Sequence, residues 1–199
     1  MPRPCSHAYH KYSVTSEIPM SFKDGKVKWW INNTGKDFWK DELEEILTGV
    51  STELNIHFEQ YGLTFEQARS RGEAFIQVYF TGYKEGLWAN MVTSLFPRMR
   101  KFFVIEPFIM DEETLAYAFG YGSGKYQGHL YINDKRDWLT QDYNLYKVAI
   151  HEALHIANVG HTDNEDDIMC PYYTNDSTIT QDCKDAIHYL YASKLPPQN

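Results

Sequence analysis

The chain has 199 residues, of which 43% are hydrophobic and 23% are charged, and its formal net charge at pH 7 is -8. This length suits one well-buried domain and is short for two, and the composition is that of an ordinary globular protein. The negative charge argues against a nucleic-acid partner, because phosphate groups would need a basic face.

The sequence shows no membrane span and no targeting segment. No apolar run is long enough to cross a bilayer, and residues 1–7 lack the apolar segment of a signal peptide. The compartment stays open, since either the chain is not secreted or its leader is absent from this sequence. Three cysteines are too few for a disulfide scaffold. Cys170 and Cys183 either pair in an oxidising compartment or are simply small buried residues. We favour the second interpretation.

The first half of the chain alternates between strand and helix patterns. Residues 1–25 carry three prolines and no clear periodicity, which predicts an irregular arm. Residues 26–32 place apolar side chains at alternate positions and predict a strand. A turn at 34–37 leads into a helix that runs to about residue 54. Its apolar face, expected to pack on a sheet, consists of Leu43, Ile46, Leu47, Val50 and Leu54.

The rest of the chain adds three strands and two helices. Strands are predicted at 74–80, 115–119 and 129–132. A helix predicted at about 140–157 is apolar over roughly half of its circumference, at about 100° per residue, so we expect it to be central and buried. After an irregular loop, residues 180–191 predict a last helix.

The central helix carries a metal-binding pattern. His151 and His155 are four residues apart, so they project from one side of the helix and can share one tetrahedral ion. Glu152 lies beside them and can take a proton from zinc-bound water without being a ligand.

A third histidine follows the helix. His161 must turn back toward the metal, so the helix has to end between positions 155 and 161. Asn158 and Gly160 are expected to end it, because asparagine and glycine most readily accept a positive φ.

The full spacing, H-E-x-x-H-x-x-N-x-x-H, resembles that of the metzincin zinc peptidases, with Asn158 in place of their commoner glycine. Met169, eight residues after His161, lies in D-I-M-C-P-Y-Y, which is similar to the Met-turn of the matrix metalloproteinases, or matrixins. The segment entering the central helix and the last helix also resemble matrixins. The likeness covers about residues 25–192.

The resemblance implies an α+β fold. A twisted, mostly parallel sheet would have an antiparallel edge strand, two long helices and a C-terminal helix below the active-site cleft. Residues 26–199 would form a single matrixin-like domain, preceded by the arm at 1–25, which could serve as a latency segment. The stretch at about 81–113 differs from the family's metal-rich loop and is interpreted as an insertion. It is either a surface excursion whose aromatic side chains pack locally or a rim that recognises a partner.

The resemblance also implies the chemistry. The chain would be a zinc-dependent endopeptidase that hydrolyses extended protein or peptide substrates, with Glu152 assisting the attack of zinc-bound water. The zinc ligands would be His151, His155 and His161, and Met169 would form a hydrophobic floor beneath the metal. The substrate would pair with the edge strand through Ala116, Tyr117, Ala118 and Phe119, and the specificity pocket would be walled by Pro171, Tyr172 and Tyr173. The rival interpretation is a zinc-bound, non-catalytic binding module that acts through the 81–113 insertion.

The family's supporting metals are not expected here. Tyr117 and Tyr131 stand where matrixins have histidine ligands of a structural zinc, and a protonated phenol is a poor zinc ligand. Asn133 and Arg136 stand in place of acidic calcium ligands. We therefore predict one catalytic zinc, no structural zinc and no calcium. The oxygen-rich run at 163–167 is interpreted as a solvated loop.

Four further expectations concern regulation and context. Cys5 lies at about the distance from the first strand at which latent matrixins carry a zinc-blocking cysteine, although its neighbours differ from the family pattern. It is either such a switch or an incidental thiol. His129 is interpreted as a surface histidine. We expect a monomer, and since matrixins are usually exported, the resemblance suggests secretion.

Overall fold

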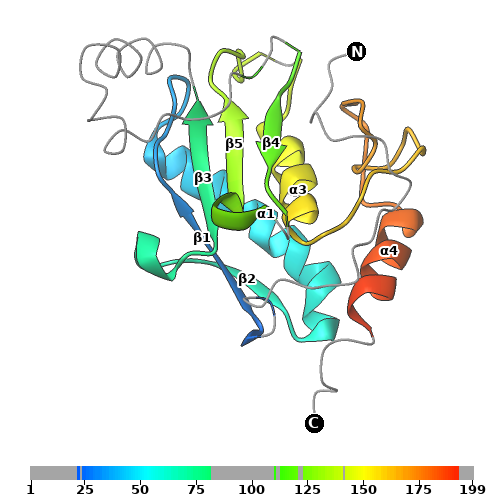
Figure 1. The fold of residues 1–199 in the computed structure, drawn as a ribbon. Helices are drawn as coiled ribbons and strands as arrows, with labels where there is room; N and C mark the ends of the chain where they lie inside the picture. The colour runs from blue at the N-terminus through cyan, green and yellow to red at the C-terminus, as the bar shows by residue number, and fades with distance from the viewer. Residues whose placement is uncertain are drawn as a thin grey trace.

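The computed structural model describes residues 22, 24–81, 110, 113–120, 123–140 and 142–192. Figure 1 shows how their elements are arranged. Nearly all of the predicted arm at 1–25, and nearly all of the predicted insertion at 81–113, lie outside the described residues. No helix within the described part is long and apolar enough to cross a membrane.

Five strands form one sheet in the order β2-β1-β3-β5-β4 (Figure 1). They are β1 (Lys26–Ile31), β2 (Thr64–Gln67), β3 (Ile76–Thr81), β4 (Ala116–Ala118) and β5 (His129–Asn133). β1 pairs in parallel with β2 and β3, β3 pairs in parallel with β5, and β4 is antiparallel to β5. The predicted α+β fold, with a mostly parallel sheet and an antiparallel edge strand, is confirmed. Strand β2 was not predicted, because its four residues include only one buried side chain, Phe65.

Three α-helices accompany the sheet: α1 (Lys40–Phe58), α3 (Leu145–Ile156) and α4 (Gln181–Tyr191). α1 contacts α3 and β2, while α3 contacts the edge strand β4. α1 extends past residue 54, where the prediction ended it, because Phe58 is fully buried against Phe65 and Tyr191. α3 begins at Leu145 rather than near residue 140. Asn144 sets that start, since its side-chain oxygen accepts the amide N–H groups of Tyr146 and Lys147.

The alternation in β1 directs its apolar residues to the helical layer, as predicted. Val27, Trp29 and Ile31 are buried, and the Trp29 indole N–H donates to the Ser51 hydroxyl of α1 at 2.7 Å. Phe22, within the predicted irregular arm, is fully buried as well and packs edge-on against Phe65. The end of the arm is therefore part of the core.

The edge strand turns small side chains toward α3. Ala116 and Ala118 pair with Ile132 and Leu130 of β5, and all four are buried on the helical face. Gly120, just beyond β4, lies so close to the end of α3 that a Cβ atom there would be 2.9 Å from the His155 carbonyl oxygen. Small residues in and after β4 thus let the edge strand lie directly over the helix that carries the metal-binding pattern.

The Trp29–Ser51 bond offers a test of how firmly α1 is fixed on the sheet. We expect Ser51→Ala to lower the free energy of unfolding by about 1–3 kcal/mol, because it leaves a buried indole N–H without its acceptor. Thr52→Ala is the matched control. It loses the same kind of hydroxyl bond to the carbonyl four residues earlier, but at an exposed site, so its effect should stay within about 0.5 kcal/mol. Chemical denaturation measures both, and equal effects of the two variants would contradict the assigned role of the bond.

Candidate active site

Helix α3 is buried on nearly every side. Its apolar residues include Leu154 and Ile156, both fully buried. Among them, His151 is 2% exposed and Glu152 0% exposed. Burying polar side chains as completely as this costs free energy unless they are hydrogen-bonded or bind a ligand. The helix is therefore built around a polar centre.

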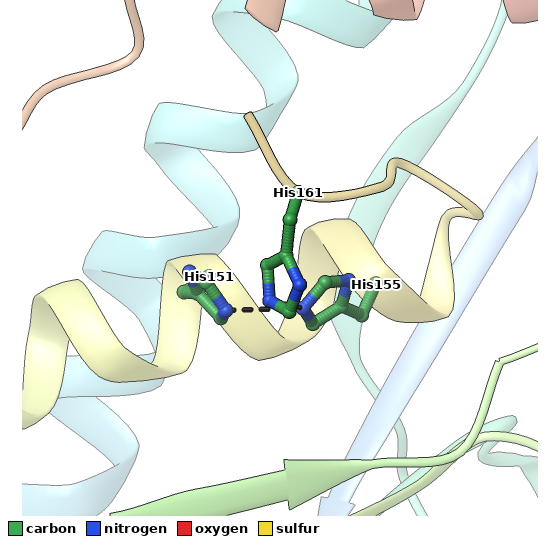
Figure 2. Close-up of side chains that lie close together, drawn as sticks. All are labelled: His151, His155 and His161. Atoms are coloured by element: carbon green, nitrogen blue, oxygen red, sulfur yellow. Dashed lines mark hydrogen bonds between the residues drawn. The ribbon is translucent and has the colours of Figure 1, made fainter. Parts of the chain in front are cut away.

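Three imidazoles converge at that centre (Figure 2). His155 Nε2 lies 3.0 Å from His151 Nε2 and 3.0 Å from His161 Nε2. A tetrahedral zinc ion with Zn–N distances of about 2.0–2.1 Å holds its ligand nitrogens about 3.3 Å apart. Within the described residues, these three side chains are the one group of three or more metal-ligating residues close enough to hold an ion. The residue types and their spacing fit a zinc ion.

Backbone carbonyls orient two of the rings. His151 Nδ1 lies 2.6 Å from the Ile168 carbonyl oxygen, and His155 Nδ1 lies 2.8 Å from that of Val159. A carbonyl can only accept, so each Nδ1 carries the proton, and in the neutral ring Nε2 keeps its lone pair. This arrangement fixes both the ring orientation and the tautomer that a metal requires.

The chain reverses at a single residue to bring His161 back. Asn158 has φ of 70° and is the one non-glycine residue with positive φ in the described part of the chain. The amide N–H groups of Asn158 and Val159 donate to the carbonyls of His155 and Leu154, both at 2.9 Å, which is the bonding of a Schellman motif. Gly160, also predicted to take part, is not among the residues with positive φ, so that part of the prediction is wrong.

Glu152 lies beside the histidines without being one of the converging groups. Neither of its carboxylate oxygens has a hydrogen-bond partner among the described residues. Burial raises the pKa of this carboxyl well above its usual value, and the backbone amide of Ala118 in β4 acts weakly in the opposite direction. Burial therefore favours the protonated form of this carboxyl, which lies next to the edge strand.

Met169 lies in a tight turn against this centre and is fully buried. Its carbonyl accepts the Thr162 amide N–H at 3.1 Å, and its own amide N–H donates to the Asp167 carboxylate at 2.7 Å. The same turn provides the Ile168 carbonyl that orients His151. The sequence therefore places the methionine in a turn that contacts the metal-binding pattern.

The comparisons with known proteins agree with this geometry. The sequence profile of the family described as Matrixin matches residues 21–192. The chain is a matrixin. Matrix metalloproteinase-25 of Mus musculus is 31% identical over 196 residues, which cover 91% of this chain and 28% of that protein.

Two further relatives match over shorter stretches. Interstitial collagenase of Bos taurus is 37% identical over 97 residues, covering 47% of this chain and 20% of that protein. Metalloendoproteinase 2-MMP of Arabidopsis thaliana is 31% identical over 102 residues, covering 44% of this chain and 26% of that protein. The matrixin chain thus spans less than a third of the length of these relatives. Matrixins are a family of zinc metalloendopeptidases.

The predicted specificity wall of this matrixin lies directly after the Met-turn. Pro171 is buried and Tyr172 is 41% exposed. The Tyr173 hydroxyl accepts the amide N–H of Asn144 and donates to the side-chain oxygen of Asn175, both at 2.7 Å. Because Asn144 caps α3, the wall is fixed to the start of the helix that carries the histidines. The sequence analysis missed Asn144, although an asparagine followed by an apolar helical pattern is a recognisable start signal.

The sheet face away from α3 carries an aromatic cluster that includes Tyr117 and Tyr131, the two residues predicted to replace ligands of a structural zinc. We call it the tyrosine cluster: Tyr79, Tyr117, Tyr126 and Tyr131 with Met110 and Phe119. Tyr117 and Tyr131 pair across β4 and β5, and Tyr131 stacks on Tyr79 with ring centroids 5.0 Å apart. Side-chain packing holds the strands together here.

Three predicted polar positions join local networks. His129 Nδ1 lies 3.0 Å from the Tyr131 hydroxyl, and burial, with a smaller effect of Arg71, lowers the pKa of this imidazole. It is partly buried, so the prediction of a surface histidine holds only in part. The buried Asn133 side chain donates to the Thr114 carbonyl at 2.8 Å, and the Arg136 guanidinium lies over the Tyr143 ring. Asn133 and Arg136, predicted to stand in place of acidic calcium ligands, thus contact neighbouring groups of this chain.

The cysteines divide between described and undescribed residues. Cys170 and Cys183 are free and buried, and burial is the main cause that raises the pKa of each thiol. They therefore match the favoured interpretation as small buried residues. Cys5 lies outside the described residues, so the predicted zinc-blocking switch stays a prediction.

The helix-ending turn generates a prediction at Asn158. Asn158→Gly should leave stability and zinc affinity nearly unchanged, because glycine adopts positive φ freely. Asn158→Val should lower the free energy of unfolding by about 1–3 kcal/mol and weaken zinc binding, because a β-branched residue is strained at φ of 70°. Denaturation and zinc titration of both variants provide the measurement. A valine variant as stable as the glycine variant would show that the turn does not require positive φ.

Proposed function

We propose that this chain is a zinc-dependent endopeptidase that hydrolyses peptide bonds in extended protein or peptide substrates. The observation that carries the proposal is the combination of three converging imidazoles with Glu152, a buried carboxyl that lies beside them without a hydrogen-bond partner among the described residues. A protein that only bound zinc for stability would gain nothing from an unpaired, fully buried carboxyl, which costs free energy. The binding-module alternative is therefore less well supported.

Each residue has a distinct role in the proposed reaction. His151, His155 and His161 would hold the zinc, which supplies Lewis acidity toward water and the substrate carbonyl. Glu152 takes a proton from the attacking water and passes it to the leaving amine. Glu152 holds the proton between the two transfers. Met169 supports the site from the Met-turn and does not contact the substrate.

The substrate would bind along β4. This strand ends the described sheet, so one of its edges is not paired within that sheet and can accept an extended peptide by strand addition. Main-chain groups of residues 116–119 would bind the peptide backbone next to Glu152, whose pKa is lowered slightly by the neighbouring Ala118 backbone against the larger effect of burial. The fixed ring of Tyr173 and the exposed ring of Tyr172, with Pro171, would wall the pocket that selects a substrate side chain.

The same proposal extends to the organisation of the chain. We propose a single catalytic domain over 26–199 that works as a monomer, with the undescribed insertion at about 81–113. By likeness to the family, we propose that it is exported.

Loss of the base tests the reaction. Wild-type protein should cleave members of a proteome-derived peptide library, and Glu152→Ala should lower cleavage by at least about 100-fold while retaining zinc, because only proton transfer is lost. The control Glu165→Ala removes an exposed carboxyl from the loop after His161 and should cleave at the wild-type rate. The mechanism is wrong if the wild type cleaves nothing or if Glu152→Ala cleaves equally well.

Metal analysis tests the number of zinc ions. Purified protein should contain about one zinc per chain, and His155→Ala should lose it, because that ring lies 3.0 Å from both other ligands. Tyr117→Phe should keep the same zinc content, since the tyrosine cluster is expected to hold no metal. Two tightly bound zinc ions in the wild type would contradict the single-centre proposal.

A further inference from the structure

The Asp167 side chain is a buried acidic group that the proposed reaction does not use. Glu152 and Asp167 are the two acidic side chains that are buried in the described part of the chain, each 0% exposed. Asp167 Oδ1 accepts the amide N–H of Met169 at 2.7 Å, and Oδ2 accepts the hydroxyl of Thr180. A carboxylate in this environment is costly unless such bonds satisfy it. Its two oxygens join the Met-turn to the start of α4.

Thr180 bonds to Asp167 instead of capping α4 with its side chain. It is the N-cap residue of α4, a position where a threonine oxygen commonly accepts an amide N–H of the helix, yet its side chain makes no such bond. Its hydroxyl donates to Asp167 instead. The start of a helix also favours a negative charge nearby. The N-terminus of α4 is therefore arranged around the Asp167 carboxylate.

The residue after Asp167 contacts His151, one of the proposed metal ligands. Ile168 lies between Asp167 and the Met169 amide that Asp167 binds, and its carbonyl oxygen is 2.6 Å from His151 Nδ1. Its amide N–H donates to the Thr178 carbonyl at 2.6 Å. Any shift of this turn would move the Ile168 carbonyl and rotate the imidazole that it orients.

We propose that Asp167 is a positioning residue for the metal centre. Its carboxylate fixes the Met-turn on α4, and the fixed Ile168 carbonyl in turn holds His151 Nε2 toward the metal. The identity of the metal rests on the proposed function, but the effect of Asp167 is read from metal affinity and not from cleavage.

The first experiment compares three variants by their affinity for zinc ions. Zinc affinity is measured by competition with a chromophoric chelator, under conditions in which circular dichroism shows the metal-free protein to be folded. Asp167→Ala should bind zinc about tenfold or more weakly. Asp167→Asn should stay within about threefold of wild type, because an amide can accept from Met169 and donate to the Thr180 hydroxyl. The matched control Asp166→Ala changes the exposed neighbour and should leave zinc affinity unchanged.

The second experiment removes the other partner of the Asp167–Thr180 hydrogen bond, the Thr180 hydroxyl. Thr180→Val removes the hydroxyl and keeps the shape of the side chain, so it should weaken zinc binding by a smaller factor than Asp167→Ala. The effects of the two changes should not add in the double variant, because both break one bond. If Asp167→Ala does not fold, Thr180→Val and Asp167→Asn still carry the test.

Wild-type zinc affinity in both Asp167→Ala and Thr180→Val would overturn the proposal, even if their denaturation midpoints fell, because Asp167 would then act on stability alone. Failure of the proposed function is a separate result. A wild-type protein that binds zinc but cleaves no peptide would refute the peptidase, while weaker zinc binding by Asp167→Ala would still support the positioning role.

Discussion

The strongest constraint on this structure is the need to hold three imidazole nitrogens close together among buried side chains. His155 Nε2 lies 3.0 Å from both of the other Nε2 atoms, and at least two of the three rings direct lone pairs inward. Such groups repel one another unless a cation lies between them, so the surrounding chain must fix them. Helix α3 fixes two rings, the left-handed turn at Asn158 returns the third, and backbone carbonyls lock the tautomers.

On the opposite face of the sheet, aromatic side chains pack against one another. Tyr117 and Tyr131 face each other across β4 and β5, and Tyr131 stacks on Tyr79. A structural metal contributes folding free energy that is lost when the metal is removed, whereas packed rings contribute by burial and ring contact whatever metals are present. In this chain, packed rings therefore contribute to holding β4 and β5 together on this face of the sheet.

The sequence predicted what is local and periodic. The alternation in β1, the apolar face of α1 and the histidine spacing each follow from a repeat of fixed length, and the structure agrees with them. The start of α3 at Asn144 could also have been read from its cap, but β2 could not, because its pattern depends on pairing with a distant strand. The roles of the Val159 and Ile168 carbonyls could not be predicted either. Every residue has a carbonyl, and only the fold decides which carbonyls orient the histidine rings.

Helix α4 illustrates how a distant element serves the site without contributing a ligand. At its N-terminus, Thr180 binds Asp167 and so anchors the turn that orients His151. At its other end, the Tyr191 hydroxyl donates to the carbonyl of Ala157, next to the left-handed Asn158, at 2.6 Å. The two ends of α4 thus bind the two turns on either side of His161, namely the turn at Asn158 and the Met-turn. A shift of α4 would therefore displace both turns and, through them, His151 and His161, although α4 itself contributes none of the three histidines.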